Sequence, residues 1–244
     1  MSSLIIFIPA RSGSTRVKNK NLQKIGKLSL LEHKIKICKS LKLGKVVVST
    51  NSKKIAKLSI KNGAEIPFLR PKKYSTSKAS TVSAILHYLR FLKKKNMRIP
   101  TYLAILPLTN PFLEKKTIIS AYKKIVKNKK INSIIGFTEA DDHPFTFIKV
   151  KKKIYFNIFR HEGSIYSDHE RTQDWPKAYI GSASLKITKT SYFLKYLKEY
   201  SPLFGIKTFD LKKTMGIKIT KKESFDINNR RDLLYANQFL NKKN

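Results

Sequence analysis

The sequence predicts an α/β fold, in which a doubly wound, mostly parallel β-sheet carries helices on both faces. Short, continuous apolar runs alternate along the chain with segments in which apolar residues recur every three or four positions. Continuous runs are typical of strands that a parallel sheet buries on both faces, and the wider spacing is typical of the helices that cover it. Since the alternation continues to about residue 138, we expect right-handed crossovers between these strands.

The first part of the chain is expected to supply alternating strands and helices. Apolar stripes predict helices over about residues 30–41, 55–63, 82–92 and 118–126. Thr50, Asn51 and Ser52 offer N-cap side chains for the second helix, and Gly63 is a typical helix stop. Pro67 indicates an edge position for the third strand, because proline cannot donate to a strand ladder. The strands are expected at residues 5–8, 45–49, 65–69, 102–106 and 133–137.

Beyond residue 138 the pattern changes. Residues 145–150 and 154–159 flank three lysines and indicate a β-hairpin, and a polar stretch follows over residues 160–177. We therefore expect one domain over residues 1–244, with an inserted hairpin and loop at about 140–180. The other elements are expected to be strands at 184–187, 205–209, 215–219 and 224–227, a helix at about 191–199, and a last helix from Asn228 or Asn229 to Leu240.

Composition excludes several classes of protein. A hydrophobic content of 41% indicates a folded chain, and the single cysteine, Cys38, excludes an internal disulfide and a thiolate metal cluster. Cys38 shares helical spacing with Ile35 and Leu41, which favours a core position. No signal peptide and no apolar run of membrane length is visible, so we expect no membrane association and a cytoplasmic location.

The net charge of +37, from 52 Lys and Arg against 15 Asp and Glu, should attract any polyanion. A polyanion-binding module is therefore one hypothesis. The lysines occur in every segment instead of forming one stripe, and no nucleic-acid-binding motif is present. These observations favour AT-rich codon usage as the origin of the charge, and we expect no specific nucleic-acid partner.

The loop after the first strand indicates anion binding. Between Pro9 and Asn21 it holds one glycine, two serines, two arginines and two lysines, at the edge where open α/β sheets bind ligands. Arginine forks and lysine point charges both suit phosphate. The spacing is not that of a P-loop or of a dinucleotide fingerprint. A basic surface loop is the alternative interpretation.

This loop resembles the opening motif of the CMP-sugar synthetases, the cytidylyltransferases that activate sialic, legionaminic and pseudaminic acids. The matching residues are Ile8-Pro9-Ala10-Arg11, Ser12-Gly13-Ser14 and Lys20-Asn21-Leu22. Further matches extend over nearly the whole chain, among them 63–71 and 106–112. The resemblance implies a fold of the nucleotide-diphospho-sugar transferase type. It also implies a Mg²⁺-dependent transfer of CMP from CTP to an acid sugar, with release of pyrophosphate.

The resemblance assigns roles to particular residues. It implies catalytic roles for Arg11, Lys20 and Asp226. Ser80 keeps a hydroxyl at a helix start, where unpaired N–H groups can hold an anion. The residues implied to bind the nucleotide are Arg11, Ser12, Gly13, Ser14, Arg16, Lys20, Asn21, Arg70, Ser80 and Thr109.

Residues 171–179 resemble the family segment that helps to bind the acid sugar. An arginine or lysine suits the sugar carboxylate, so the candidates are Arg171, Gln173, Lys177 and Tyr179. A solvated polar loop is the alternative. The insertion before this segment builds the dimer interface in the family, which implies a homodimer.

Residues 225–228 resemble the family's closing Asp-Ile-Asp motif, whose carboxylates hold magnesium. Asp226 is retained, and Asn228 could offer only a carbonyl oxygen, so these two residues are the metal candidates. Both could instead cap the last helix.

The chain departs from the family pattern at several positions that bear on activity. Pro107 replaces a glutamine that reads cytosine, a departure that resembles the pseudaminic acid branch, and Ser14-Thr15-Arg16 resembles the octulosonate synthetases. A divergent member with low or no activity and an octulosonate cytidylyltransferase are therefore alternatives. The departures are Thr15, Asn51, Ser77, Pro107 and Asn228.

Overall fold

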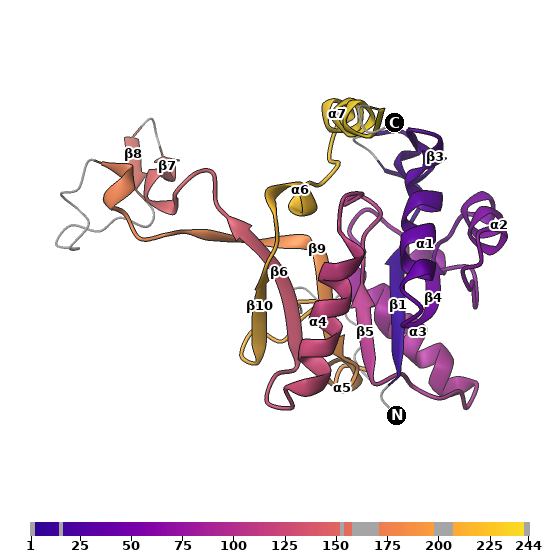
Figure 1. Ribbon diagram of the computed structural model, residues 1–244. Helices are drawn as coiled ribbons and strands as arrows, with labels where there is room; N and C mark the ends of the chain where they lie inside the picture. Colours follow the sequence, from indigo (N-terminus) through magenta and orange to yellow (C-terminus); the bar gives the residue numbers. More distant parts are fainter. Residues whose placement is uncertain (1–2, 15–16, 152–153, 158–170, 198–206, 242–244) are drawn as a thin grey trace.

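A six-stranded sheet in the order β10-β6-β9-β5-β1-β4 forms the centre of the computed structural model (Figure 1). The structure describes residues 3–14, 17–151, 154–157, 171–197 and 207–241. The sheet strands are β1 (Leu4–Pro9), β4 (Gly44–Ser49), β5 (Tyr102–Ile105), β6 (Ser133–Glu139), β9 (Tyr179–Lys189) and β10 (Thr214–Lys218). Two small pairs are separate from it: β2 (Lys24–Ile25) with β3 (Leu28–Ser29), and β7 (Ile148–Lys151) with β8 (Ile154–Asn157).

The helices lie between and beside these strands. They are α1 (Leu30–Ser40), α2 (Lys53–Lys61), α3 (Thr81–Lys94), α4 (Lys115–Lys127), α5 (Ser191–Leu194), α6 (Lys221–Ser224) and α7 (Arg230–Asn241). Single turns of 3₁₀ helix occur at Lys20–Leu22, Lys72–Tyr74, Pro144–Thr146 and Thr172–Asp174. None of the described helices is long and apolar enough to cross a membrane.

The sheet is mostly parallel, which confirms the predicted fold class. β1 pairs parallel with β4 and β5, and β10 pairs parallel with β6. β9 lies between β5 and β6 and is antiparallel to both. β9 is also longer than the predicted strand at 184–187, because its first half continues along β6 as far as Glu139.

Side chains alternate between two cores on opposite faces of the sheet. Leu4, Ile6 and Ile8 of β1 pack with α1 and α4 on one face, whereas Ile5 and Phe7 pack with α3 on the other. Both sets are buried, which explains why β1 is a continuous apolar run. Cys38 is fully buried in the first core, as its spacing predicted.

The pairing of β1 with β4 requires Gly44. A Cβ atom at this position would lie 2.0 Å from the carbonyl oxygen of Leu4, which stands opposite it in the ladder. The close approach of two backbones therefore excludes any side chain here.

The β7–β8 hairpin projects from the sheet as an arm, together with the start of the chain's return toward β9 (Figure 1). β7 and β8 thus form a hairpin within the region where the insertion is predicted. His143 bonds the carbonyl oxygen of Pro176 over 2.8 Å, and its ring lies 5.0 Å from that of Trp175. The two chain segments that leave and re-enter the sheet are thus joined at the base of the arm.

Three expected strands are wrong or shortened. Residues 65–69 form only one parallel bridge, between Glu65 and Val47, because Pro67 lacks an N–H and Phe68 turns to pack on His87 at 4.3 Å. The expected strand at 224–227 is the end of α6 followed by an extended segment. Residues 207–209 form no strand, and residues 205–206 lie outside the described part.

Two expected elements differ in extent. Thr220 and Glu223 form a reciprocal capping box, which starts helix α6 just before the expected strand at 224–227. The helix expected at 191–199 is one turn, α5, and residues 198–199 lie outside the described part.

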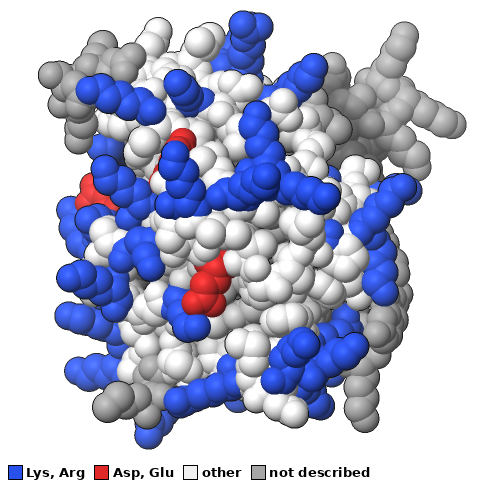
Figure 2. Space-filling model, turned by 90° about the vertical axis from the view of Figure 1, so that its right-hand side faces the viewer, with Lys and Arg blue, Asp and Glu red and all other residues white. Residues whose placement is uncertain are grey.

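Lysine and arginine side chains are spread over the face that Figure 2 shows, with uncharged surface between them. On this face they form no single basic stripe. The distribution agrees with the interpretation of the charge as a general property of the composition.

Candidate functional site

The loop after β1 forms a small cavity of about 100 Å³ at the carboxyl edge of the sheet. Gly13 has a φ of 82°, a conformation that side chains disfavour, and this turn directs the loop around the cavity. Six of the predicted nucleotide-binding residues line it: Arg11, Ser12, Gly13, Ser14, Lys20 and Asn21. Arg16 lies outside the described residues.

Hydrogen bonds from distant segments hold this loop. The side-chain amide of Asn21 donates to the carbonyl oxygen of Arg11 over 2.8 Å, and the backbone N–H of Ser12 donates to Oδ1 of Asn51 over 2.8 Å. The contact of Asn51 requires only an acceptor, so the amide that replaces the family's acid still fixes the loop.

Sequence reasoning missed a lysine of the cavity. Lys54, in the first turn of α2, lines the same space as Arg11 and Lys20. The sequence did contain a signal for Lys54. This residue follows the capping segment Thr50–Ser52, which comes directly after a buried parallel strand, and helices that start there face the edge where ligands bind.

Arg70 is 5% exposed and is held at the end of β4. Its Nε donates to Oγ of Ser49 over 2.9 Å, and Nη2 donates to the carbonyl oxygen of Ser49. Burial, and to a lesser degree the charge of Arg11, lowers the pKa of Arg70 to about 10. Arg70 therefore supports the cavity from behind and adds positive potential beside Arg11.

Two other predicted nucleotide residues make contacts within the protein. The hydroxyl of Ser80 accepts from the N–H of Ser83 over 3.1 Å and so caps α3. The carbonyl oxygen of Thr109 accepts from the N–H of Ile227 over 2.8 Å. Ser80 thus acts as a helix cap, and Thr109 joins the loop after β5 to the C-terminal segment.

The C-terminal segment 225–228 lies against the loop after β1. Nζ of Lys20 donates to the carbonyl oxygen of Ile227 over 2.8 Å, and the side chain of Asn110 donates to the carbonyl oxygen of Phe225 over 2.9 Å. With the bond from Ile227 to Thr109, both neighbours of Asp226 are fixed. The structure therefore brings Lys20 and Asp226, two of the three predicted catalytic residues, to one place.

The carboxylate of Asp226 fits a hard cation. Its Oδ1 atom is buried and has no hydrogen-bond partner among the described residues, and its Oδ2 accepts from Nδ2 of Asn228 over 3.0 Å. The described residues contain no cluster of three or more metal-binding side chains. Such a setting suits Mg²⁺, which is usually held by one or two carboxylates together with substrate phosphates.

Asn228 differs from its predicted role in one respect. It presents its amide nitrogen, not its oxygen, to Asp226, and its backbone N–H donates to Asp232 over 2.7 Å. In this arrangement Asn228 orients the carboxylate of Asp226. Asn229 caps the start of α7 in place of both, because its side-chain oxygen accepts from the N–H of Asp232 over 3.0 Å.

Two further lysines of the site were missed by sequence reasoning. Lys186 is a half-buried residue in the centre of β9; burial lowers its pKa, and the charge of Asp226 opposes this shift. Lys34 of α1 is 1% exposed and donates to the carbonyl oxygen of Asn110 over 2.6 Å. Burial lowers the pKa of Lys34 to about 8. Neither lysine follows a motif, because each reaches the site only through the packing of its element.

The predicted sugar-binding residues lie elsewhere. Arg171, Gln173 and Lys177 are exposed on the segment that joins the arm to β9, and Figure 1 shows this segment apart from the loop after β1. Tyr179 begins β9, where its ring lies 5.3 Å from that of Phe137 and 5.9 Å from Nζ of Lys218. Within one chain, the structure does not bring these four residues to Lys20 and Asp226.

The arrangement can bind a polyphosphate and a metal ion. Arg11, Lys20 and Lys54 line a cavity, and the adjoining segment carries one buried carboxylate oxygen that has no hydrogen-bond partner among the described residues. Cations stabilise phosphate charge as it develops, and a carboxylate supplies the metal ligand.

Comparisons with known proteins agree with this chemistry. Residues 5–238 match the model of a family described as cytidylyltransferase. Post-translational flagellin modification protein B of Campylobacter coli is 28% identical over 255 aligned residues, covering 100% of this chain and 97% of that protein. Pseudaminic acid cytidylyltransferase of Campylobacter jejuni is 29% identical over 181 aligned residues, covering 72% of this chain and 73% of that protein.

A solved structure shares the fold. The CMP:2-keto-3-deoxy-manno-octonic acid synthetase complexed with CTP superposes with a TM-score of 0.69 over 100% of both chains, at 12% identity. Since the family match spans most of the chain, the protein is a nucleotidyltransferase of a kind that generally uses a divalent metal, and it belongs to the cytidylyltransferase family.

Proposed function

We propose that this protein transfers CMP from CTP to a nonulosonic acid of the pseudaminic, legionaminic or sialic type and releases pyrophosphate. The family match and the names of its relatives support this reaction. One observation carries the assignment to particular residues: the hydrogen bond from Lys20 to Ile227 joins the phosphate-type loop to the segment of Asp226.

In this reaction the sugar hydroxyl oxygen forms a bond to the α-phosphorus of CTP. The bond from that phosphorus to the oxygen it shares with the β-phosphate breaks, pyrophosphate leaves, and the hydroxyl proton passes to water. No covalent enzyme intermediate is required, because positioning and charge lower the barrier.

The triphosphate would occupy the cavity after β1, where Arg11 and Lys20 neutralise its charge and the loop N–H groups orient it. Arg70 and Lys54 add positive potential from the ends of β4 and α2. Mg²⁺, held by Asp226 and phosphate oxygens, would neutralise charge on the reacting phosphate. Lys186 lies near Asp226 and would face the same phosphate group.

The acid sugar would be held by Arg171, Gln173, Lys177 and Tyr179. Because this segment stands on the projecting arm, we propose a homodimer in which the arm of one protomer reaches the site of its partner. We also propose that residues 1–244 form one domain and that the enzyme works in the cytoplasm, where CTP is available.

The test is pyrophosphate release from CTP and Mg²⁺ with purified pseudaminic, legionaminic and sialic acids, and with 3-deoxy-octulosonate as a separate arm. We expect turnover with at least one nonulosonic acid and its loss in Asp226→Ala. Turnover with the octulosonate alone would identify the related octulosonate activity. If Asn228→Asp restores turnover that the native chain lacks, the departures have weakened the site; no turnover in either would contradict the proposal.

A further inference from the structure

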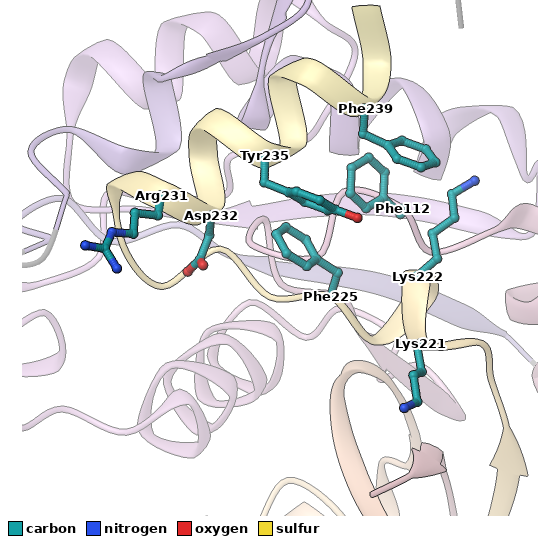
Figure 3. A pocket seen from close by; sticks show the side chains of 8 residues that line it. All are labelled: Phe112, Lys221, Lys222, Phe225, Arg231, Asp232, Tyr235 and Phe239. Carbon is teal, nitrogen blue, oxygen red and sulfur yellow. The ribbon is translucent and has the colours of Figure 1, made fainter. Parts of the chain in front are cut away.

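A second, larger pocket lies between α6 and α7, outside the proposed phosphate cavity. It encloses about 470 Å³ and shares no lining residue with the loop after β1. A pocket of this size can hold a small organic molecule. Figure 3 shows that the side chains around it come from the loop after β5, from α6 and the segment after it, and from α7.

Aromatic rings form the wall of this pocket. The ring of Phe225 lies 5.6 Å from that of Phe112 and 5.2 Å from that of Tyr235, and Phe112 lies 5.0 Å from Phe239. Tyr235 is 54% exposed although it is a large aromatic residue. In Figure 3 the ring of Tyr235 extends over the ring of Phe225. Because Tyr235 is largely exposed, its ring is available for stacking on a ligand.

Positive charge lies at the ends of this aromatic wall. Nζ of Lys222 lies 4.6 Å from the centre of the Phe239 ring, and Arg231 stands at the opposite end in Figure 3. Within the described residues, neither Lys222 nor Arg231 forms an ion pair. The one acidic residue of the lining, Asp232, accepts from the N–H groups of Asn228 and Asn229 at 2.7 and 2.9 Å. The charge thus favours an anionic ligand.

The pocket is coupled to the proposed metal site through the backbone. Phe225, which forms part of its wall, directly precedes Asp226, and its carbonyl oxygen is fixed by Asn110. Asp232, at its edge, fixes the N–H group of Asn228. A ligand that packs on Phe225 would restrict the same segment that Mg²⁺ and CTP require to be ordered.

We propose that the pocket between α6 and α7 is a binding site for a small anion carrying a flat ring, and that its occupation favours the binding of CTP and Mg²⁺ at Asp226. The binding half is independent of the proposed reaction, whereas the coupling half rests on it. The positive charge of Lys222 and the exposed ring of Tyr235 carry the choice of ligand class.

A pair of fluorescent probes tests the binding half. 8-Anilinonaphthalene-1-sulfonate has flat rings and a negative charge, and N-phenyl-1-naphthylamine has similar rings and no charge. We expect the sulfonate to bind more tightly, and we expect Tyr235→Ala and Lys222→Gln each to weaken it about tenfold. Leu234→Ala, also on α7, and Lys123→Gln, an exposed lysine of α4, serve as matched controls that should bind like the native chain.

Two results would overturn the binding half. One is equal affinity for the sulfonate in Tyr235→Ala, Lys222→Gln and the controls, which would show that the probe binds to the general basic surface. The other is equal affinity for the charged and the neutral probe. Circular dichroism of each variant ensures that lost binding does not reflect unfolding.

Fluorescence also tests the coupling without any turnover. If the sulfonate raises the affinity for CTP and Mg²⁺ by some factor, saturating CTP and Mg²⁺ must raise the affinity for the sulfonate by the same factor, because linkage is reciprocal. We expect an effect of at least about threefold, and its absence in Asp226→Ala. Unchanged or weaker binding would overturn the coupling. Absence of sugar-dependent turnover would contradict the proposed function but leave this measurement valid.

Discussion

Nζ of Lys20 donates a hydrogen bond of 2.8 Å to the carbonyl oxygen of Ile227, across 207 positions of sequence. The contact joins the first loop of the sheet to the segment that carries Asp226. The cation proposed to bind phosphate and the segment that carries the carboxylate proposed to bind metal are thereby joined before any substrate arrives.

Replacing Lys20 tests this relationship. Lys20→Met removes a charged hydrogen bond, which is worth about 1.5–3 kcal/mol, so we expect kcat/KM for CTP to fall roughly ten- to a hundredfold. Steady-state pyrophosphate release provides the measurement. Lys18→Met, at an exposed position of the same loop, is the control. Equal kinetics in the two variants would contradict a specific role for Lys20.

Asn228→Asp tests how the metal is held. The substitution removes the donor to Oδ2 of Asp226 and adds a second carboxylate beside it. We expect a lower Mg²⁺ concentration for half-maximal activity, because two carboxylates bind the ion more tightly. Without metal, we expect about 0.5–1.5 kcal/mol lower stability in urea unfolding, since like charges now meet and a hydrogen bond is lost. An unchanged Mg²⁺ dependence would place the ion elsewhere.

Arg70→Lys tests the support behind the cavity. A lysine cannot make both contacts of the guanidinium with Ser49, so we expect a loss of about 1–3 kcal/mol in the free energy of unfolding and a higher KM for CTP. Arg98→Lys, at an exposed position, is the matched substitution. If both variants unfold at the same urea concentration, the buried contacts of Arg70 contribute nothing to stability.

Lys186→Met tests the cation on β9. We expect turnover to fall at least about tenfold, with little change in stability, because the half-buried ammonium group lies near Asp226 and would face the reacting phosphate. Lys189→Met is the control, because this lysine of the same strand donates to the carbonyl oxygen of Lys129 over 2.8 Å and should leave turnover unchanged. Retained turnover in Lys186→Met would exclude a role for this cation in the reaction.

Lys34→Met tests a buried charge through its pH dependence. The folded chain lowers the pKa of Lys34 to about 8, so between that value and its ordinary one the unfolded chain binds more protons. The penalty of burying the ammonium group is therefore complete below about pH 8 and disappears as the pH rises toward about 10.5.

We expect the stability of Lys34→Met relative to the native chain to decrease over this range by up to about 3 kcal/mol. Urea unfolding at several pH values gives the difference, and the titrations of the other lysines cancel in it. A difference that stays constant with pH would show that folding does not shift the pKa of Lys34.

Much of the fold was predictable because local patterns carried it. The apolar run of β1, the stripe of α3 and the capping residue Ser52 each specify their element within a few neighbouring residues. Where the local pattern was ambiguous, tertiary contacts decided which secondary structure the segment adopts. The short run at 224–227 became the end of a capped helix, and 65–69 followed the packing of Phe68 on His87 instead of a strand ladder.

By itself, the sequence determined the α/β class and the basic loop from Arg11 to Asn21, since residue types and short spacings express these features. Its resemblance to the family singled out Asp226 as the proposed acid of the site. Only the tertiary structure decided that Lys20 meets the segment of Asp226 and that the segment of Arg171 stands on the arm. It also decided that Lys54 lines the cavity, that Lys34 bonds Asn110 and that Lys186 lies close enough to Asp226 to feel its charge. The physical reason is that such contacts join residues far apart in the chain, and they exist only once the sheet and its helices have packed.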